Sequence, residues 1–205
     1  MLSALSLVRD EETGYHIKRT SEFVRILAQE LIDRGALDES ERHDLVDMMS
    51  RVAPLHDIGK IGTPDHVLLK PGKFTAAEFD VISQHAEIGY KILSGSDSEL
   101  LKVAAIIAWT HHERYDGTGY PRKLKGEDIP IEGRIASIAD NFDALTTARV
   151  YKPAFDFEHA RDLMIKERGK HFDPELLDLF LSAPEDLRRI HEQYADSSRQ
   201  NSTAA

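Results

Sequence analysis

The sequence of 205 residues contains no cysteine. This absence excludes disulfide bonds, thiolate zinc sites, iron–sulfur clusters and cysteine nucleophiles. At about 150 residues per domain, the length predicts one domain with a core large enough to be stable without cross-links. We expect that domain to cover residues 1–195 and to be followed by a flexible polar tail over residues 196–205.

Basic residues are scarce relative to acidic ones, with 26 Lys and Arg against 36 Asp and Glu and a formal net charge of −10. Non-specific duplex binding normally needs a basic face, so we expect no nucleic acid polymer as a partner. Long hydrophobic runs are also missing, since the longest, Val103–Trp109, is far shorter than the roughly 20 residues of a membrane-spanning helix. Residues 1–8 lack the basic start of a signal peptide. The prediction is a cytoplasmic protein without membrane insertion.

Hydrophobic residues with helical spacing dominate the sequence. Thr75 and Glu78 form a capping-box pattern, and Asp173 precedes a proline at a predicted helix start. No stretch alternates with a period of two, so the predicted fold class is all-α. The expected helices cover residues 17–31, 45–56, 75–95, 100–111 and 131–145, with a further one from 173 to 180.

Two long loops interrupt this helical pattern, over residues 56–72 and 112–130. Both are broken by glycine and proline. Loops of this length in a compact helical domain are usually either functional or disordered.

The sequence has ten histidines, and five of them fall with three carboxylates on inward-facing positions. Imidazole and carboxylate without thiolate suit iron, manganese, zinc or nickel better than magnesium or calcium. Each residue alone could be a hydrogen-bonded core side chain or a solvated acid, but the coincidence of all eight favours a metal site. The eight candidates are Glu12, His16, His56, Asp57, His85, His111, His112 and Asp140. No role is assigned to the other five histidines, His43, His66, His159, His171 and His191.

Several of these residues lie in recognisable motifs. They are Glu12-Thr-Gly-Tyr-His16, His56-Asp57-Ile-Gly-Lys60, His85, the segment from His111 to Pro121, and Asp140-Asn-Phe-Asp143. In this order and spacing the sequence resembles the HD-GYP domain, a subgroup of the HD phosphohydrolase superfamily, from about Arg9 to about Phe180. The resemblance implies an all-α HD-domain helical bundle with a metal cluster in its core and long glycine-rich active-site loops.

The resemblance also implies a function and a cofactor. Family members hydrolyse cyclic di-GMP to pGpG, GMP or both, by attack of a metal-bridging hydroxide on the phosphodiester. They hold two or three divalent ions, most often iron, with manganese as the alternative and zinc or nickel as further options. The eight candidates would be the ligands, with Asp57 as the bridging carboxylate and Glu12 as the ligand of a third ion.

Lys60 resembles the family lysine that contacts the scissile phosphate. We expect it to stabilise the developing charge or to protonate the leaving group. The alternative is a structural salt bridge with Asp57 or Asp65. Asp143 and Glu113 are expected to orient imidazoles or Lys60 from outside the ligand set.

Substrate contacts are expected from two further segments. Arg149 and Lys152 resemble residues that bind the substrate phosphates, although Ala148 and Val150 differ from the family pattern; a solvated face is the alternative. In the second loop, Gly119 would allow close backbone approach to a ligand, and Tyr120 offers an aromatic face and a hydroxyl. Without the resemblance, a plain surface turn would be the preferred interpretation of that loop.

Other functions and partners stay open at this point. The alternatives are a hydrolase of another phosphoester, such as pGpG or cyclic GMP-AMP, and a cyclic di-GMP-binding receptor with weak turnover. Family members usually carry an upstream sensory or receiver domain. The apolar N-terminal residues Leu2, Leu5 and Val8 could form a homodimer contact. A protein of the diguanylate cyclase type is a further candidate partner, through the Gly-Tyr-Pro loop.

Overall fold

The computed structural model describes residues 14–34, 39–148 and 154–194, the side chains of residues 39–44 excepted. Among them the regular structure is helical and no β-strand forms, which confirms the predicted all-α class. The longer helices are α2 (Gly14–Asp33), α3 (Glu39–Val52), α5 (Ala76–Ser83), α6 (His85–Leu93), α7 (Glu99–Thr110), α8 (Ile131–Thr146), α9 (Phe157–Lys166), α10 (Pro174–Leu181) and α11 (Pro184–Gln193). The short ones are η1 (Ala53–Leu55), η2 (Ile58–Gly62), α4 (Asp65–Leu68) and η3 (Gly126–Asp128).

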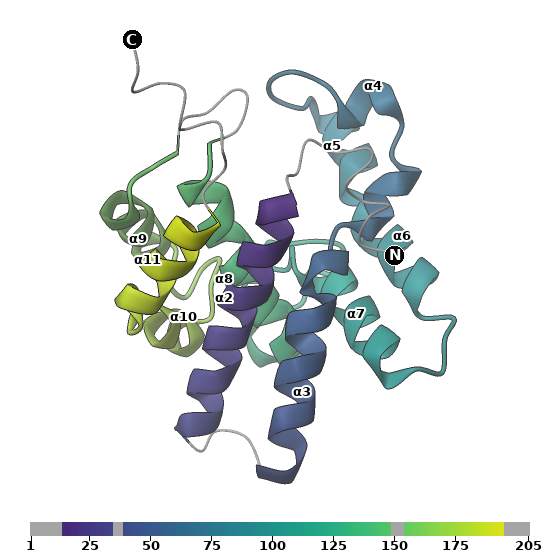
Figure 1. Cartoon of the computed structure of the whole chain (residues 1–205). Helices are drawn as coiled ribbons and strands as arrows, with labels where there is room; N and C mark the ends of the chain where they lie inside the picture. Colours follow the sequence, from purple (N-terminus) through teal and green to yellow (C-terminus); the bar gives the residue numbers. More distant parts are fainter. Residues whose placement is uncertain (1–13, 35–38, 149–153, 195–205) are drawn as a thin grey trace.

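Helix α2 is at the centre of the arrangement (Figure 1). It packs against α3, α8, α10 and α11, and α7 packs against both α3 and α8. Figure 1 shows α9, α10 and α11 on one side of α2, and α4 to α7 on the other side. The two groups of helices are therefore connected through α2, α3 and α8.

An aromatic cluster joins three of these helices in the main core. Phe23 of α2, Phe142 of α8 and Phe180 of α10 are fully buried. Their ring centroids lie 5.1 to 6.0 Å apart and the rings meet edge to face. Each such pair adds about 1 kcal/mol beyond the burial of apolar surface. The cluster holds the side of α2 that faces α8 in a defined position.

Two predicted helix starts are confirmed in atomic detail. The Thr75 hydroxyl accepts from the backbone N–H of Glu78, while the Glu78 carboxylate accepts from the N–H of Thr75, 2.7 Å away. The carboxylate of Asp173 accepts from the N–H groups of Glu175 and Leu176 at 2.9 and 3.1 Å. Both starts follow from local side-chain hydrogen bonds that the sequence pattern specifies.

Two predicted helices are shorter than expected, and each ends a few residues before a histidine that is a predicted ligand. The helix expected to reach His56 ends at Val52, because Pro54 cannot continue it, and η1 follows. The helix expected over residues 75–95 is two helices, α5 and α6, with His85 at the start of the second. Its break follows from burial: α5 has no buried residue, whereas α6 buries one face in the core.

Helices α9 and α11 were not predicted. Their starts carry recognisable signals: Asp156 caps α9 by accepting from the N–H of His159, and α11 begins at Pro184. Each helix contributes only two buried residues. The short apolar stripe explains why hydrophobic periodicity did not reveal them.

Across the described ranges, none of the helices combines the length and the apolar character needed to cross a lipid bilayer.

Helix η2 packs directly on the first turn of α6. A Cβ atom added to Gly59 would lie 1.9 Å from the carbonyl oxygen of His85 and 2.5 Å from the backbone nitrogen of Gly89. Only glycine fits at this contact. Gly59 therefore sets the separation between the segment that carries Asp57 and the helix that carries His85.

Replacing Gly59 with Ala should reduce the free energy of unfolding by about 1–3 kcal/mol, because the core at this contact cannot accept a methyl group without a backbone shift. Urea denaturation measures the change. The matched control is Gly95→Ala, since no atom lies within 4 Å of the added Cβ at Gly95. Equal unfolding free energies for the two variants would contradict the close packing.

The second loop contains a left-handed residue that is not glycine. Lys123 has φ of 56°, a conformation that costs a side-chain-bearing residue about 1–2 kcal/mol. We expect Lys123→Gly to raise the free energy of unfolding by about 1 kcal/mol, measured in the same denaturation assay. Lys125 in the same loop has φ of −130°, so Lys125→Gly should lower stability. The same sign for both variants would argue against strain at Lys123.

Candidate metal centre

The structure brings seven of the eight predicted ligands together in two groups. One group is Asp57, His85, His111 and His112, and the other is His16, His56 and Asp140. Within each group, one ligand atom from every residue lies within 4.8 Å of the others. Six of the seven come from helix ends or from the segments just beyond them. The clustering therefore depends on where the helices end.

Backbone carbonyls hold the outer nitrogens of three imidazoles. His56 Nδ1 lies 2.8 Å from the carbonyl oxygen of Ala53, and His85 Nδ1 lies 2.6 Å from that of Ile82. His111 Nδ1 lies 3.1 Å from the carbonyls of Ile107 and Ala108. A carbonyl oxygen only accepts, so each Nδ1 carries a proton and donates it. In the neutral rings, the lone pair is then on Nε2, which faces the centre of the site.

The inward nitrogens of the imidazoles lie close together. His85 Nε2 and His111 Nε2 are 3.5 Å apart. Burial lowers the pKa of His111, and burial together with the neighbouring His111 lowers the pKa of His112 well below its ordinary value. The imidazoles of His111 and His112 are therefore neutral at pH 7, and each can offer a lone pair. A divalent cation between the inward nitrogens would turn this close arrangement into ligation. The residues fit a metal.

Asp57 lies between the two groups. Its Oδ1 is 3.1 Å from His85 Nε2, and its Oδ2 is 3.3 Å from His56 Nε2. Burial raises the pKa of this carboxyl group, but Lys60 and the imidazoles outweigh burial and hold the pKa well below its ordinary value. Asp57 is thus an anion with one oxygen toward each group. This placement suits a carboxylate that bridges two ions, the role that the resemblance implies.

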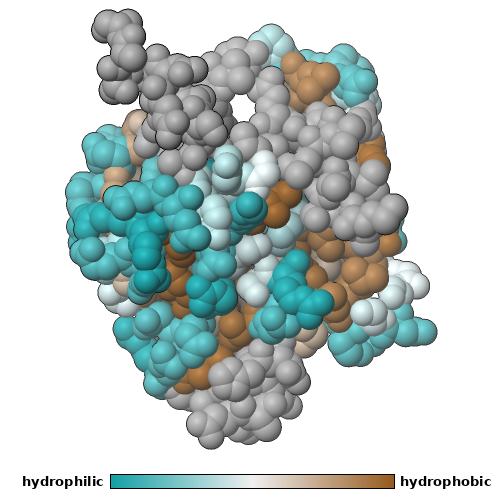
Figure 2. All heavy atoms as spheres, in the orientation of Figure 1, coloured by the Kyte–Doolittle hydropathy of each residue, from teal (hydrophilic) through white to brown (hydrophobic). Residues whose placement is uncertain are grey.

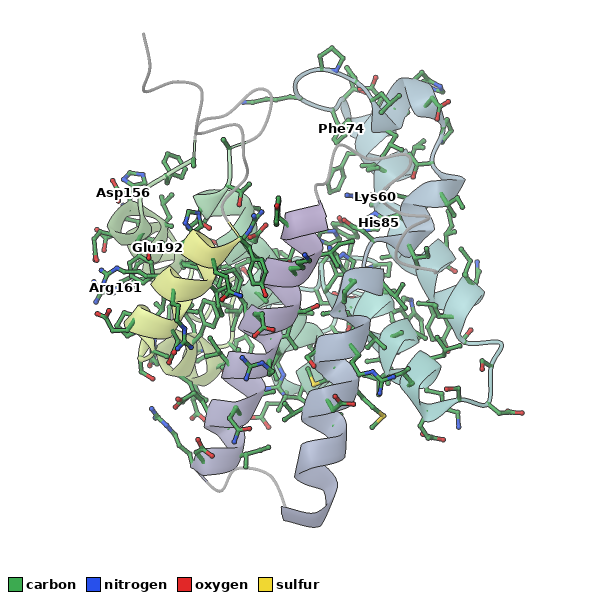
Figure 3. The ribbon with its side chains drawn as sticks, in the orientation of Figure 1. Lys60, Phe74, His85, Asp156, Arg161 and Glu192 are labelled. Atoms are coloured by element: carbon green, nitrogen blue, oxygen red, sulfur yellow. The ribbon has the colours of Figure 1, made fainter. Side chains whose placement is uncertain are left out.

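Lys60 forms a salt bridge with Asp57, the predicted alternative to a role at the substrate phosphate. Its Nζ lies 2.6 Å from Asp57 Oδ2, and its side chain is one fifth exposed. Figure 3 shows Lys60 close to His85, at the edge of the site below α5. The ion pair places the ammonium group beside the ligand groups, within reach of a bound anion.

A buried chain of polar groups positions His16. Its Nδ1 donates to Asp143 Oδ2 at 2.7 Å, and the guanidinium of Arg19 binds both oxygens of the same carboxylate. Arg19 also donates to the carbonyl oxygen of Tyr194, 2.7 Å away, at the end of α11. Burial raises the pKa of Asp143, but His16 and Arg19 lower the pKa by more than burial raises it. The carboxyl group therefore stays ionised. Asp143 therefore orients an imidazole, as predicted.

Sequence reasoning missed Arg19, which is fully buried. A signal existed, because Arg19 follows His16 by one helical turn and lies on the same inward face as Thr20 and Phe23. A charge on an apolar stripe needs a partner. Only the fold shows that the partner comes from α8.

Glu113 was expected to orient an imidazole or Lys60, but its carboxylate binds the backbone of the second loop instead. Its carboxylate accepts from the backbone N–H groups of Arg122 and Leu124 at 2.7 and 3.1 Å. These donors also belong to the second loop. Glu113 therefore joins the beginning of that loop to its middle by hydrogen bonds. Gly119 is buried in the same loop, and a Cβ there would lie 2.3 Å from the backbone nitrogen of Arg114. Close approach within the loop accounts for this glycine, and its contact with a ligand stays a prediction.

Tyr120 lies against the ligand groups. Its ring stacks on that of His112, with centroids 4.7 Å apart. Three predicted site residues, Glu12, Arg149 and Lys152, lie outside the described residues, and their roles stay predictions.

We expect Asp143→Asn to weaken metal binding about 10- to 100-fold, because an amide cannot supply the charge that fixes the His16 tautomer. The measurement is metal content per chain after dialysis against a graded series of chelator concentrations. Asp162→Asn on the exposed surface of α9 is the control and should retain metal like the wild type. Unchanged retention in the Asp143 variant, with a normal unfolding temperature, would rule out a positioning role.

Comparison with known proteins agrees with this geometry. The family model described as "HD domain" matches residues 8–176. A cyclic di-GMP phosphodiesterase of Vibrio cholerae is 44% identical over 202 residues, which cover 96% of this chain and 41% of that protein. A 3′3′-cGAMP-specific phosphodiesterase of the same organism, phosphodiesterase 2, is 44% identical over 84% of this chain and 32% of its own length. The chain thus spans less than half the length of these relatives.

The fold is also found in a solved structure. A cyclic GMP-AMP-specific phosphodiesterase of Vibrio cholerae superposes with a TM-score of 0.66 over 97% of this chain and 50% of that one, at 18% identity. This likeness concerns the fold alone. The family model that matches residues 8–176 and the relative at 44% identity show that the chain belongs to the HD domain family.

Proposed function

We propose that this chain is a metal-dependent phosphodiesterase that hydrolyses cyclic di-GMP to pGpG, GMP or both. One observation carries the proposal: the inward imidazole nitrogens of His85 and His111 face each other at 3.5 Å beside the anionic Asp57 and the ammonium of Lys60. Buried ligand atoms of this kind are stable together around divalent cations. The names of relatives at 44% identity support a cyclic dinucleotide as the substrate.

Each group in the site has a proposed task. Divalent cations at the two ligand groups would lower the pKa of a water molecule and offset the negative charge of the phosphodiester. The His16, His56 and Asp140 group and the His85, His111 and His112 group would hold them, with Asp57 shared. Seven ligands in two groups suit two ions. Glu12 is proposed as the ligand of a third, and iron or manganese as the physiological metal.

Lys60 is proposed to act on the reacting phosphate. Water adds to phosphorus, the bond from phosphorus to the ribose 3′ oxygen breaks, and the leaving oxygen takes a proton. The Lys60 ammonium beside Asp57 is placed to neutralise the charge that develops or to supply this proton. Arg149 and Lys152 are proposed to bind the remaining phosphate oxygens.

Two alternatives remain distinct from this proposal. A relative named for 3′3′-cGAMP is as similar to this chain as one named for cyclic di-GMP, so the hybrid dinucleotide is the second candidate substrate. A receptor that binds the dinucleotide with weak turnover is the other alternative. An upstream sensory or receiver domain, a homodimer and a diguanylate cyclase-type partner at the Gly-Tyr-Pro loop also stay proposals.

Protein purified without oxygen and loaded with iron or manganese should convert cyclic di-GMP to pGpG, as followed by chromatography. Lys60→Ala should lower kcat at least about 100-fold while metal content stays the same, because this lysine acts on the reacting phosphate. Lys91→Ala, an exposed lysine of α6, is the matched control and should keep wild-type kcat.

Three outcomes separate the alternatives. Faster turnover of 3′3′-cGAMP than of cyclic di-GMP would transfer the proposal to the hybrid substrate. Tight nucleotide binding without turnover under any metal would favour the receptor. Fewer than two metals per chain, with Asp57 intact, would reject the cluster.

A further inference from the structure

A row of aromatic rings leads from the metal centre to the surface of α5. Tyr120 stacks on His112 and meets the ring of His85 at a centroid distance of 6.2 Å. On its other side, Tyr120 meets Phe79 of α5 edge to face, with centroids 5.6 Å apart. Phe79 therefore contacts Tyr120, and the ring of Tyr120 in turn lies against two predicted ligands.

The outer end of this row is exposed. Phe79 is 47% exposed and Phe74, on the segment before α5, is 39% exposed. Figure 2 shows hydrophobic side chains at the upper right of the molecule, around α4. Figure 3 shows Phe74 on that segment, above Lys60 and His85. Two exposed phenylalanines therefore belong to the part of the chain that borders the site.

Core packing does not account for these rings. Helix α5 has no buried residue, so Phe79 contributes no fully buried side chain to the hydrophobic core. The capping box and the ion pair between Lys70 and Glu78 fix the start of α5, and the helix packs against α4 and α6. An apolar ring that such a helix presents to solvent beside a binding site is suited to a flat apolar ligand group.

We propose that Phe79, assisted by Phe74, is a stacking surface for a purine base of the cyclic dinucleotide. The inference rests on the proposed function, because it requires the scissile phosphate to lie at the metal centre beside Lys60. A base joined through its ribose to that phosphate extends outward past Tyr120, where Phe79 presents its ring. Base–aromatic stacking favours the larger purines and needs no hydrogen bond for affinity. Phe79 is thus a specificity-determining residue.

The test is steady-state kinetics of the metal-loaded chain with cyclic di-GMP. Phe79→Ala should raise KM about tenfold and leave kcat and metal content unchanged, since the ring binds the base and touches no reacting atom. Phe79→Trp should keep the wild-type KM. Phe79→Leu should behave like the alanine variant, because leucine keeps the apolar bulk but has no ring face.

Two controls make the result specific. Ile165→Ala removes an apolar side chain of similar exposure from α9 and should change neither constant. With cyclic di-UMP, whose bases are smaller, Phe79→Ala should change KM less than with cyclic di-GMP. The unfolding temperature of each variant checks that α5 remains folded.

The outcomes distinguish this inference from the function on which it rests. Hydrolysis by the wild type, combined with a wild-type KM for Phe79→Ala or Phe79→Leu, overturns the stacking role and leaves the phosphodiesterase intact. A fall in kcat or in metal content with no change in KM assigns Phe79 to the support of Tyr120 instead and also overturns it. Absence of turnover in the wild type removes both proposals.

Discussion

Buried imidazoles are tolerated here because backbone carbonyls determine which nitrogen of each ring carries the proton. The carbonyls of Ala53, Ile82 and Ile107 accept from Nδ1 and direct the Nε2 lone pairs inward. Water is largely excluded, so these lone pairs and the charge of Asp57 have little solvation to stabilise them. A bound cation would supply the missing stabilisation, and the folding of the centre would then be coupled to metal binding.

The imidazoles share carbonyls that the backbone already uses. A carbonyl oxygen has two lone pairs, so it can accept from a backbone N–H and from an imidazole N–H together. The carbonyl of Ala53 accepts from both the N–H and Nδ1 of His56, and that of Ile82 accepts from the N–H of Gln84 and from Nδ1 of His85. Gly59 then lets η2 approach α6 closely enough for Asp57 to reach His85.

The polar chain from Arg19 connects the centre to distant segments. Arg19 joins α2, α8 and the end of α11 through Asp143 and Tyr194, so a change in the C-terminal helix can reach His16 through hydrogen bonds alone. A separate set of hydrogen bonds, from Arg122 and Leu124 to Glu113, holds the loop that carries Tyr120. The position of His16 and that of the proposed base-binding surface are therefore each supported by buried hydrogen bonds.

The sequence alone determined the all-α class, the capped starts at Thr75 and Asp173, and the seven predicted metal ligands that the structure brings together. Helical periodicity, capping and a recognisable motif order are local properties of the chain. Helices α9 and α11 escaped detection because their buried stripes are short. Only the tertiary structure decided which nitrogen of each histidine faces inward, that Arg19 serves Asp143, that Glu113 closes a loop, and that Phe79 continues a row of rings. These features depend on contacts between residues distant in sequence, such as the 124 positions between Arg19 and Asp143, and no local pattern encodes the geometry of such contacts.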